Sequence, residues 1–172
     1  MNFHRSATVA IVASLLAACA SAPSPQPAAP AFDPAPMLAA IQQAGVSDSR
    51  ELVVSPLADA RTAGLHEDVA ALHRQGRLAD MATLLDDALE TLPDDPYLLQ
   101  VRAESALQQG DLTGAERFAR RAAAAGSQAG PNCRRHWETV VQAVAAQSLD
   151  GDALADAKTR RDACTVAAPP RY

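Results

Sequence analysis

Two segments, Gln75-Gly-Arg-Leu-Ala-Asp-Met81 and Gln109-Gly-Asp-Leu-Thr-Gly-Ala115, decide the fold because they share one pattern at a fixed interval. A 34-residue interval separates their glycines, Gly76 and Gly110, and each glycine is followed two positions later by a leucine. Apolar residues recur with helical spacing around both segments, from about Thr62 onward. A repeat of this length with a glycine turn predicts pairs of antiparallel helices that stack on one another.

The composition of the chain agrees with a helical protein. The 172 residues are 48% hydrophobic but only 3% aromatic, so the apolar content is mostly Ala, Leu and Val. Such side chains favour closely packed helices over a β-rich core. The net charge of -5 repels nucleic acids and anionic membrane surfaces. We therefore expect an all-α protein that does not bind nucleic acid.

Residues 1–18 have the features of a secretory signal peptide. A short positive region ends at Arg5, and an apolar run follows over residues 7–16. This run is too short to cross a bilayer as a helix, which takes about 20 apolar residues. We therefore set residues 1–18 apart from the folded protein.

The stretch that follows, Leu16-Ala-Ala-Cys19, resembles the lipobox of bacterial lipoproteins, in which the cysteine becomes the acylated N-terminus. The resemblance implies that Cys19 carries the lipid, and that this lipid is the only contact of the protein with a membrane. Because Ala20 stands where many inner-membrane lipoproteins have Asp, it also implies an outer-membrane anchor that faces the periplasm. The alternative is an ordinary signal peptide that is cleaved after Ala18, Ala20 or Ala22.

A linker and a lead-in segment precede the repeats. Residues 19–36 form the linker; six of its last seventeen residues are proline, which predicts a disordered spacer of up to roughly 50 Å. Residues 37–61 form the lead-in, which begins with a predicted helix over residues 37–44 and Gly45 as its C-cap. Residues 50–56 favour an extended strand without a partner, so we expect them to lie along the first helices.

The repeated segments resemble the tetratricopeptide repeat (TPR), whose units are two antiparallel helices with small residues where the helices cross. The resemblance implies a first unit at residues 62–95 and a second at residues 96–129. Asp95 and Pro96 would serve as N-cap and first helical residue of the second unit. An elongated third hairpin would follow, so the TPR-like domain covers residues 62–164 and residues 165–172 form a tail. The implied fold is a short α-solenoid of about two and a half to three hairpins.

Four residues depart from the TPR pattern. Val69 and Met81 stand where the family prefers Gly or Ala, and Asp68 and Arg102 stand where it prefers Leu. The 34-residue period is kept through all of them.

Once Cys19 is assigned to the lipid, two cysteines remain, in a compartment where disulfides persist. Cys133 and Cys164 lie at the open end of the predicted third hairpin, whose arms of about 24 and 20 Å match in length. We therefore predict a Cys133–Cys164 disulfide. A zinc site with His136 and a redox-active pair are the alternatives, but zinc lacks a fourth ligand and no Cys-x-x-Cys motif is present. The neighbouring Arg134 and Arg135 are interpreted as solvated surface.

No catalytic, metal or cofactor site is predicted. His66 and His73 are seven residues apart, whereas two helical metal ligands need a spacing of four. No Gly-x-Ser-x-Gly or phosphate-binding loop is present in the sequence. The acidic pairs Asp86-Asp87 and Asp94-Asp95 are interpreted as a solvated helix face and a helix cap. We therefore expect a protein that is not an enzyme.

The TPR resemblance implies a groove along the first helix of each hairpin that receives a peptide or a partner domain. Carried over by position, the groove residues are His66, Ala70, His73, Arg74, Tyr97, Gln100, Glu104, Gln108, Arg135, Glu138 and Gln142. The expected function is a protein-protein adaptor in an assembly of the cell envelope. The alternative is a structural subunit of an envelope complex that packs without using the groove.

Overall fold

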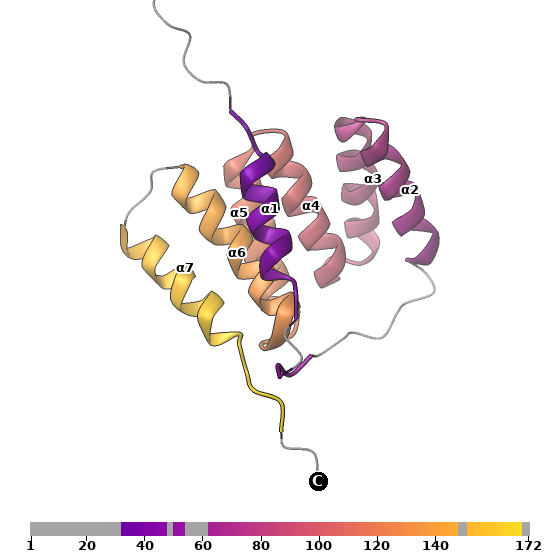
Figure 1. Ribbon diagram of the computed structural model, residues 1–172. Coiled ribbons are helices and arrows are strands. Elements are labelled where there is room, and N and C mark those ends of the chain that lie inside the picture. The colour runs from indigo at the N-terminus through magenta and orange to yellow at the C-terminus, as the bar shows by residue number, and fades with distance from the viewer. Residues whose placement is uncertain (1–31, 48–49, 54–61, 148–150, 170–172) are drawn as a thin grey trace, which may run out of the picture. The chain divides into compact units, whose positions relative to one another are not determined.

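The computed structural model describes residues 32–47, 50–53, 62–147 and 151–169. The predicted signal peptide, Cys19 and most of the predicted linker lie outside these residues. In the described part the chain forms helices and no strand, which confirms the predicted all-α class (Figure 1). The helices are α1 (Ala35–Ala44), α2 (Ala63–Arg74), α3 (Leu78–Thr91), α4 (Pro96–Gln108), α5 (Leu112–Ala125), α6 (Gly130–Ala146) and α7 (Gly151–Ala163).

From α2 to α7 each helix packs against the next one along the chain, and α4 also contacts α6 (Figure 1). The turns from α2 to α3 and from α4 to α5 use Gly76 and Gly110, whose φ angles are +68° and +77°. Glycine adopts this left-handed conformation without steric cost, so it reverses the chain directly after a helix. The two glycines that mark the sequence repeat therefore have the same conformation.

Aspartate side chains cap the helices that follow two of the turns. The Asp95 carboxylate accepts a hydrogen bond from the Leu98 N–H at 2.9 Å, and Pro96 is the first residue of α4. Asp111 caps α5 in the same way, with the Gly114 N–H as donor at 2.8 Å. Each carboxylate satisfies an N–H group that has no partner within the helix.

The main core joins α2 through α7. Its largest fully buried side chains are Leu85, Leu98, Leu99, Val140 and Val144, which come from α3, α4 and α6. Small residues of α4 and α5, including Ala103, Ala119 and Ala122, are also fully buried and allow the helix backbones to approach one another closely.

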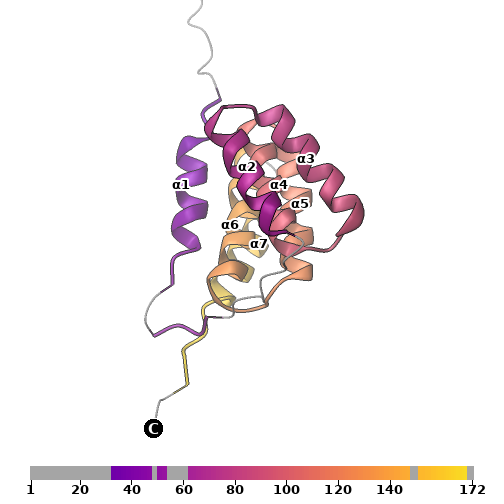
Figure 2. The same cartoon turned by 90° about the vertical axis from the view of Figure 1, so that its right-hand side faces the viewer.

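Helix α1 packs against α6 (Figure 2). Its Ile41 is fully buried in a second apolar cluster, separate from the main core. The other buried members of this cluster are Ala106, Leu107, Ala115 and Ala143. The helix begins two residues before the predicted start, because Pro36 is tolerated in the first turn of a helix, where no N–H bond is required.

The lead-in after α1 pairs with the C-terminal segment. The Leu52 N–H donates to the Val166 carbonyl and the Ala168 N–H donates to the Arg50 carbonyl, each at 2.8 Å. The prediction that this segment lies along the first helices without a strand partner is wrong for residues 50–53, because the C-terminal segment supplies backbone groups to them. Residues 54–61 lie outside the described part.

A disulfide closes the last hairpin at its open end. Cys133 lies in the first turns of α6 and Cys164 directly follows α7, with 2.03 Å between the sulfur atoms and 5.6 Å between the Cα atoms. Both cysteines are buried, and the Gly130 N–H donates to the Cys164 carbonyl at 2.7 Å. This is the pairing that the matched arms of the hairpin predict.

Candidate functional site

A recess of about 410 Å³ lies between α1, α2, α4 and α6; we call it the central recess. Its lining residues are Leu38, Gln42, His66, Val69, Ala70, His73, Arg74, Met81, Tyr97, Val101, Glu104, Gln108 and Arg135. Eight of the eleven predicted groove residues are among them. The structure therefore brings together residues from three helices that the sequence grouped only by their position in the repeat.

The central recess combines apolar and polar side chains. Val69 and Met81 are buried behind the recess, whereas Leu38 and Val101 are half-buried and provide accessible apolar surface. His73 and Arg74 are exposed at the end of α2. The Arg74 side chain forms no ion pair with any residue that the structure describes.

Tyr97 and His66 bridge α4 and α2 across the recess. Their ring centroids are 4.1 Å apart, with an angle of 46° between the ring planes. Burial raises the pKa of the Tyr97 hydroxyl, although the charge of Arg135 opposes this shift. The Nε2 atom of His66 is buried and has no hydrogen-bond partner within the described residues.

An ion pair between Arg135 and Glu104 joins α6 to α4 at the recess. Two parallel hydrogen bonds of 2.8 Å connect the guanidinium and the carboxylate. The side chains of Arg134 and Arg135 are only 16% and 29% exposed, and both form ion pairs. The interpretation of these two arginines as solvated surface is therefore wrong, because each binds a carboxylate from another part of the chain.

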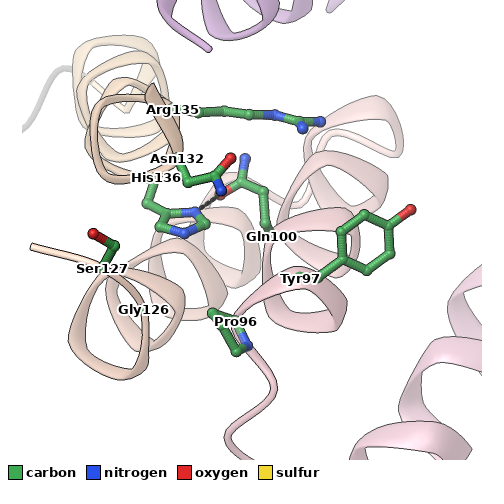
Figure 3. A pocket seen from close by; sticks show the side chains of 8 residues that line it. All are labelled: Pro96, Tyr97, Gln100, Gly126, Ser127, Asn132, Arg135 and His136. Atoms are coloured by element: carbon green, nitrogen blue, oxygen red, sulfur yellow. Dashed lines mark hydrogen bonds between the residues drawn. The ribbon is translucent and has the colours of Figure 1, made fainter. Parts of the chain in front are cut away.

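A second, smaller cavity of about 70 Å³ adjoins the recess; we call it the His136 pocket (Figure 3). Its lining residues are Pro96, Tyr97, Gln100, Gly126, Ser127, Asn132, Arg135 and His136. Tyr97 and Arg135 line both cavities, so the pocket and the recess lie next to each other. Gln100 was expected at the groove surface, but it is only 2% exposed and lines this pocket instead.

The polar groups behind the His136 pocket form a buried hydrogen-bond network. Gln100 Oε1 lies 2.7 Å from Nδ1 of His136, and Gln100 Nε2 donates to Glu104 at 2.7 Å and to Thr139 at 2.8 Å. Burial, and to a lesser extent the charge of Arg135, lowers the pKa of His136 to about 4. The imidazole is therefore neutral at pH 7.

Glu138 and Gln142 line neither cavity. Glu138 is buried and accepts a hydrogen bond from Arg161 of α7 at 2.8 Å, and Gln142 donates to the same carboxylate. The third hairpin is displaced from the 34-residue period. Of the three residues carried over to α6, only Arg135 lines the recess, whereas Glu138 is bound by α7. His136, which the sequence suggested only as a metal ligand, lines the smaller pocket together with Asn132 and Arg135 of the same helix.

Leu38 and Gln42 of α1 are recess residues that the sequence did not predict. The apolar spacing of Met37, Leu38 and Ile41 indicates a helix with one apolar face. It does not indicate which surface of the repeats receives that face, because the contact joins segments far apart in the chain.

In the described part of the chain, no group of three or more His, Cys, Asp and Glu side chains is placed to hold a metal ion. Among the described helices, none is long and apolar enough to cross a membrane. The chain matches no protein-family model, no curated protein and no solved structure.

Proposed function

We propose that the chain is an outer-membrane lipoprotein, anchored through Cys19, whose TPR-like domain binds an envelope protein or peptide in the central recess. The adaptor function rests mainly on one observation. Eight residues chosen from the TPR resemblance line a single recess on α2, α4 and α6. Residues picked by a wrong register would be scattered over the surface and the core.

The repeat geometry supports a TPR-like arrangement of the helices. The turn glycines Gly76 and Gly110 lie one repeat interval apart and share the left-handed conformation. Helices α3 and α5 begin at Leu78 and Leu112, which are separated by the same interval. A displaced third hairpin, closed by the disulfide, then acts as the C-terminal cap of the array.

The chemistry of the recess indicates the kind of partner. The half-buried apolar side chains of Leu38 and Val101 would cover the apolar face of a peptide, and the polar residues around them would bind its ends. The exposed Arg74 favours an acidic residue at the α2 side. An interface of this mixed type gives an adaptable contact of moderate affinity rather than a deep apolar anchor.

Site-specific photo-crosslinking in cells tests the adaptor function. Gln100 is unsuitable for the photoreactive residue because it is buried in the network, so Ala70 and His73, both exposed at the recess, are the positions to use. Glu90 of α3 is the matched control; it is exposed and lies nine residues, about two and a half turns, from Met81, on the opposite side of the helix. We expect one envelope protein to be captured from the recess positions and not from Glu90.

Equal capture from both faces, or from neither, would contradict the adaptor function and favour a subunit that packs without the groove. A charge reversal at the recess tests whether the captured partner is bound there. Arg74→Glu should reduce capture of the partner from Ala70, whereas Arg117→Glu on α5 should leave the capture unchanged.

The lipid anchor is tested independently of the groove. Cells labelled with radioactive palmitate should yield a labelled wild-type protein and an unlabelled Cys19→Ser variant. Fractionation of the two membranes should place the wild-type protein in the outer one. A mature wild-type protein without lipid, insensitive to inhibition of the lipoprotein signal peptidase, would show that the anchor is wrong.

A further inference from the structure

The orientation of the Gln100 side-chain amide is fixed by its neighbours. Its Nε2 lies 2.7 Å from the Glu104 carboxylate, which only accepts hydrogen bonds. It also lies 2.8 Å from the Thr139 hydroxyl oxygen, whose own proton is donated to the Arg135 carbonyl at 3.0 Å. A reversed amide would place its carbonyl oxygen against the carboxylate, so the oxygen Oε1 must face His136.

This orientation determines which nitrogen of His136 carries the proton. Gln100 Oε1 only accepts, so Nδ1 of His136, 2.7 Å away, is the donor. The neutral imidazole then has its lone pair on Nε2. Because the ring is only 4% exposed and its pKa is lowered to about 4, this tautomer is kept throughout the physiological pH range.

The lone pair on Nε2 points toward Gly126 and Pro96, which both line the His136 pocket. No residue in the described part of the chain donates a hydrogen bond to it, and Figure 3 shows this nitrogen on the side of Gly126 and Pro96. A Cβ atom on residue 126 would lie 3.2 Å from Nε2, 3.3 Å from the Cβ of Pro96 and 2.9 Å from the Ala122 carbonyl oxygen. Glycine at this position therefore avoids a clash with the Ala122 carbonyl oxygen and leaves space beside Nε2 of His136.

The volume of the pocket limits what it can hold. About 70 Å³ is several times the 10–15 Å³ that one water needs, and about half of a cavity that holds benzene. A side-chain group of about three or four heavy atoms fits a volume of this size. The side-chain amide of Asn132, which forms no hydrogen bond with any described residue, adds a second polar group to the wall.

We propose that the His136 pocket is a side-chain subsite that takes a threonine or serine of the bound partner, with its hydroxyl proton donated to Nε2 of His136. The location of this residue within a partner rests on the proposed function, since the pocket shares Tyr97 and Arg135 with the central recess. A carboxylate has no proton to donate to Nε2. A lysine or arginine would bring a second positive charge beside Arg135. Valine has the shape of threonine but leaves the buried acceptor without a partner.

The test uses two probes of nearly equal shape with the full-length protein. N-acetyl-threonine methylamide and N-acetyl-valine methylamide differ by a hydroxyl in place of a methyl group. Each is titrated while the ¹⁵N resonances of His136 are followed by NMR. We expect the threonine probe to shift the Nε2 resonance in a saturable manner and to bind about tenfold more tightly than the valine probe. Equal affinity of the two probes, or no saturable shift at Nε2, would overturn the subsite.

Two variants test whether the preference for the threonine probe arises in the His136 pocket. His136→Phe removes the acceptor and should abolish the preference for threonine. If that variant does not fold, Asn132→Leu fills the pocket from its partly exposed side and should weaken both probes without changing the tautomer of His136. Unchanged threonine binding in the folded variant would overturn the assignment.

The subsite and the adaptor function fail separately. Saturable threonine binding combined with no crosslinked partner would contradict the adaptor and support the subsite. Conversely, a partner captured from the recess that binds His136→Phe or Asn132→Leu as tightly as the wild type would support the adaptor and overturn the subsite.

Discussion

The guanidinium of Arg134 lies against the carboxylate of Glu51, although the two residues are 83 positions apart in the chain. The same guanidinium donates hydrogen bonds to the carbonyl groups of Ala44 and Val46, each at 2.7 Å, and to the Thr165 hydroxyl at 3.1 Å. One side chain at the start of α6 thus fastens the end of α1, the lead-in and the C-terminal segment. Because α1 forms one wall of the central recess, Arg134 indirectly determines the shape of the proposed binding site.

Replacement of Arg134 by Ala should release α1 while the helical hairpins remain folded. The side chain of Glu51 is only 3% exposed, and removal of a cation from a buried pair costs on the order of 3 kcal/mol. We expect amide hydrogen exchange in α1 to become roughly a hundredfold faster, with little change in α4 and α5. Arg77→Ala is the matched control, because it removes an exposed pair with Asp80 and should change exchange little. Unchanged protection of α1 would show that Ile41 and its apolar neighbours hold the helix without the arginine.

Loss of the Cys133–Cys164 disulfide should lower the stability of the whole domain. The bridge joins residues 31 positions apart, and a loop of this size stabilises by about 3 to 4 kcal/mol in the chain-entropy model. Urea unfolding of the Cys133→Ser, Cys164→Ser double variant should show this difference. The wild-type protein should show the same difference when dithiothreitol is added, whereas the variant should not respond. Equal stability with and without reductant in the wild type would contradict the prediction.

Several elements of the fold were predictable because they depend on neighbouring residues. The turn at Gly110 requires a residue that tolerates positive φ, and the cap at Asp95 requires a carboxylate three residues before a free N–H. Arg102, by contrast, stands where the tetratricopeptide pattern prefers leucine and is held by contacts with two other helices. It stacks on Phe118 of α5 at 4.8 Å and forms an ion pair with Asp86 of α3.

The parts that could not be predicted depend on contacts between distant segments. The apolar face of α1 is visible in the sequence, but the cluster that receives Ile41 is assembled from α4, α5 and α6. Likewise, Glu138 was assigned to the groove by the repeat interval, and only the displaced packing of α7 brings Arg161 to it. The network that joins Gln100 to His136 spans 36 residues and leaves no local signal.

The turn glycines should differ from helical glycines in their response to alanine. Gly76 has a φ of +68° and open space around it, so Gly76→Ala should destabilise by about 1 to 2 kcal/mol through backbone strain alone. Gly64 lies in the first turn of α2 with nothing within 4 Å of an added Cβ, so Gly64→Ala should stabilise by up to about 1 kcal/mol. Thermal unfolding of the two variants should show shifts of opposite sign. Destabilisation by both substitutions would contradict this assignment of their backbone roles.

The stability of the protein should depend on pH through His136. Burial and the nearby charge of Arg135 lower its pKa to about 4 in the folded protein, from an ordinary value of 6.5. Between these two values the unfolded chain binds a proton that the folded protein does not bind, so the free energy of unfolding falls as the pH is lowered from 6.5 to 4. The loss attributable to this group is about 3 kcal/mol over the window.

His136→Leu isolates this contribution, because leucine does not titrate and the remaining histidines and the carboxylates are common to both proteins. The variant loses the hydrogen bond to Gln100, which lowers its free energy of unfolding by a roughly constant amount above pH 6.5. As the pH is lowered, the wild type loses the extra stability of its neutral imidazole and the two free energies of unfolding should converge. Urea titrations at closely spaced pH values measure the difference directly. Parallel curves between pH 6.5 and 4 would mean that His136 accepts its proton in the folded protein as readily as in the unfolded chain, and the fixed tautomer on which the threonine subsite depends would then fail as well.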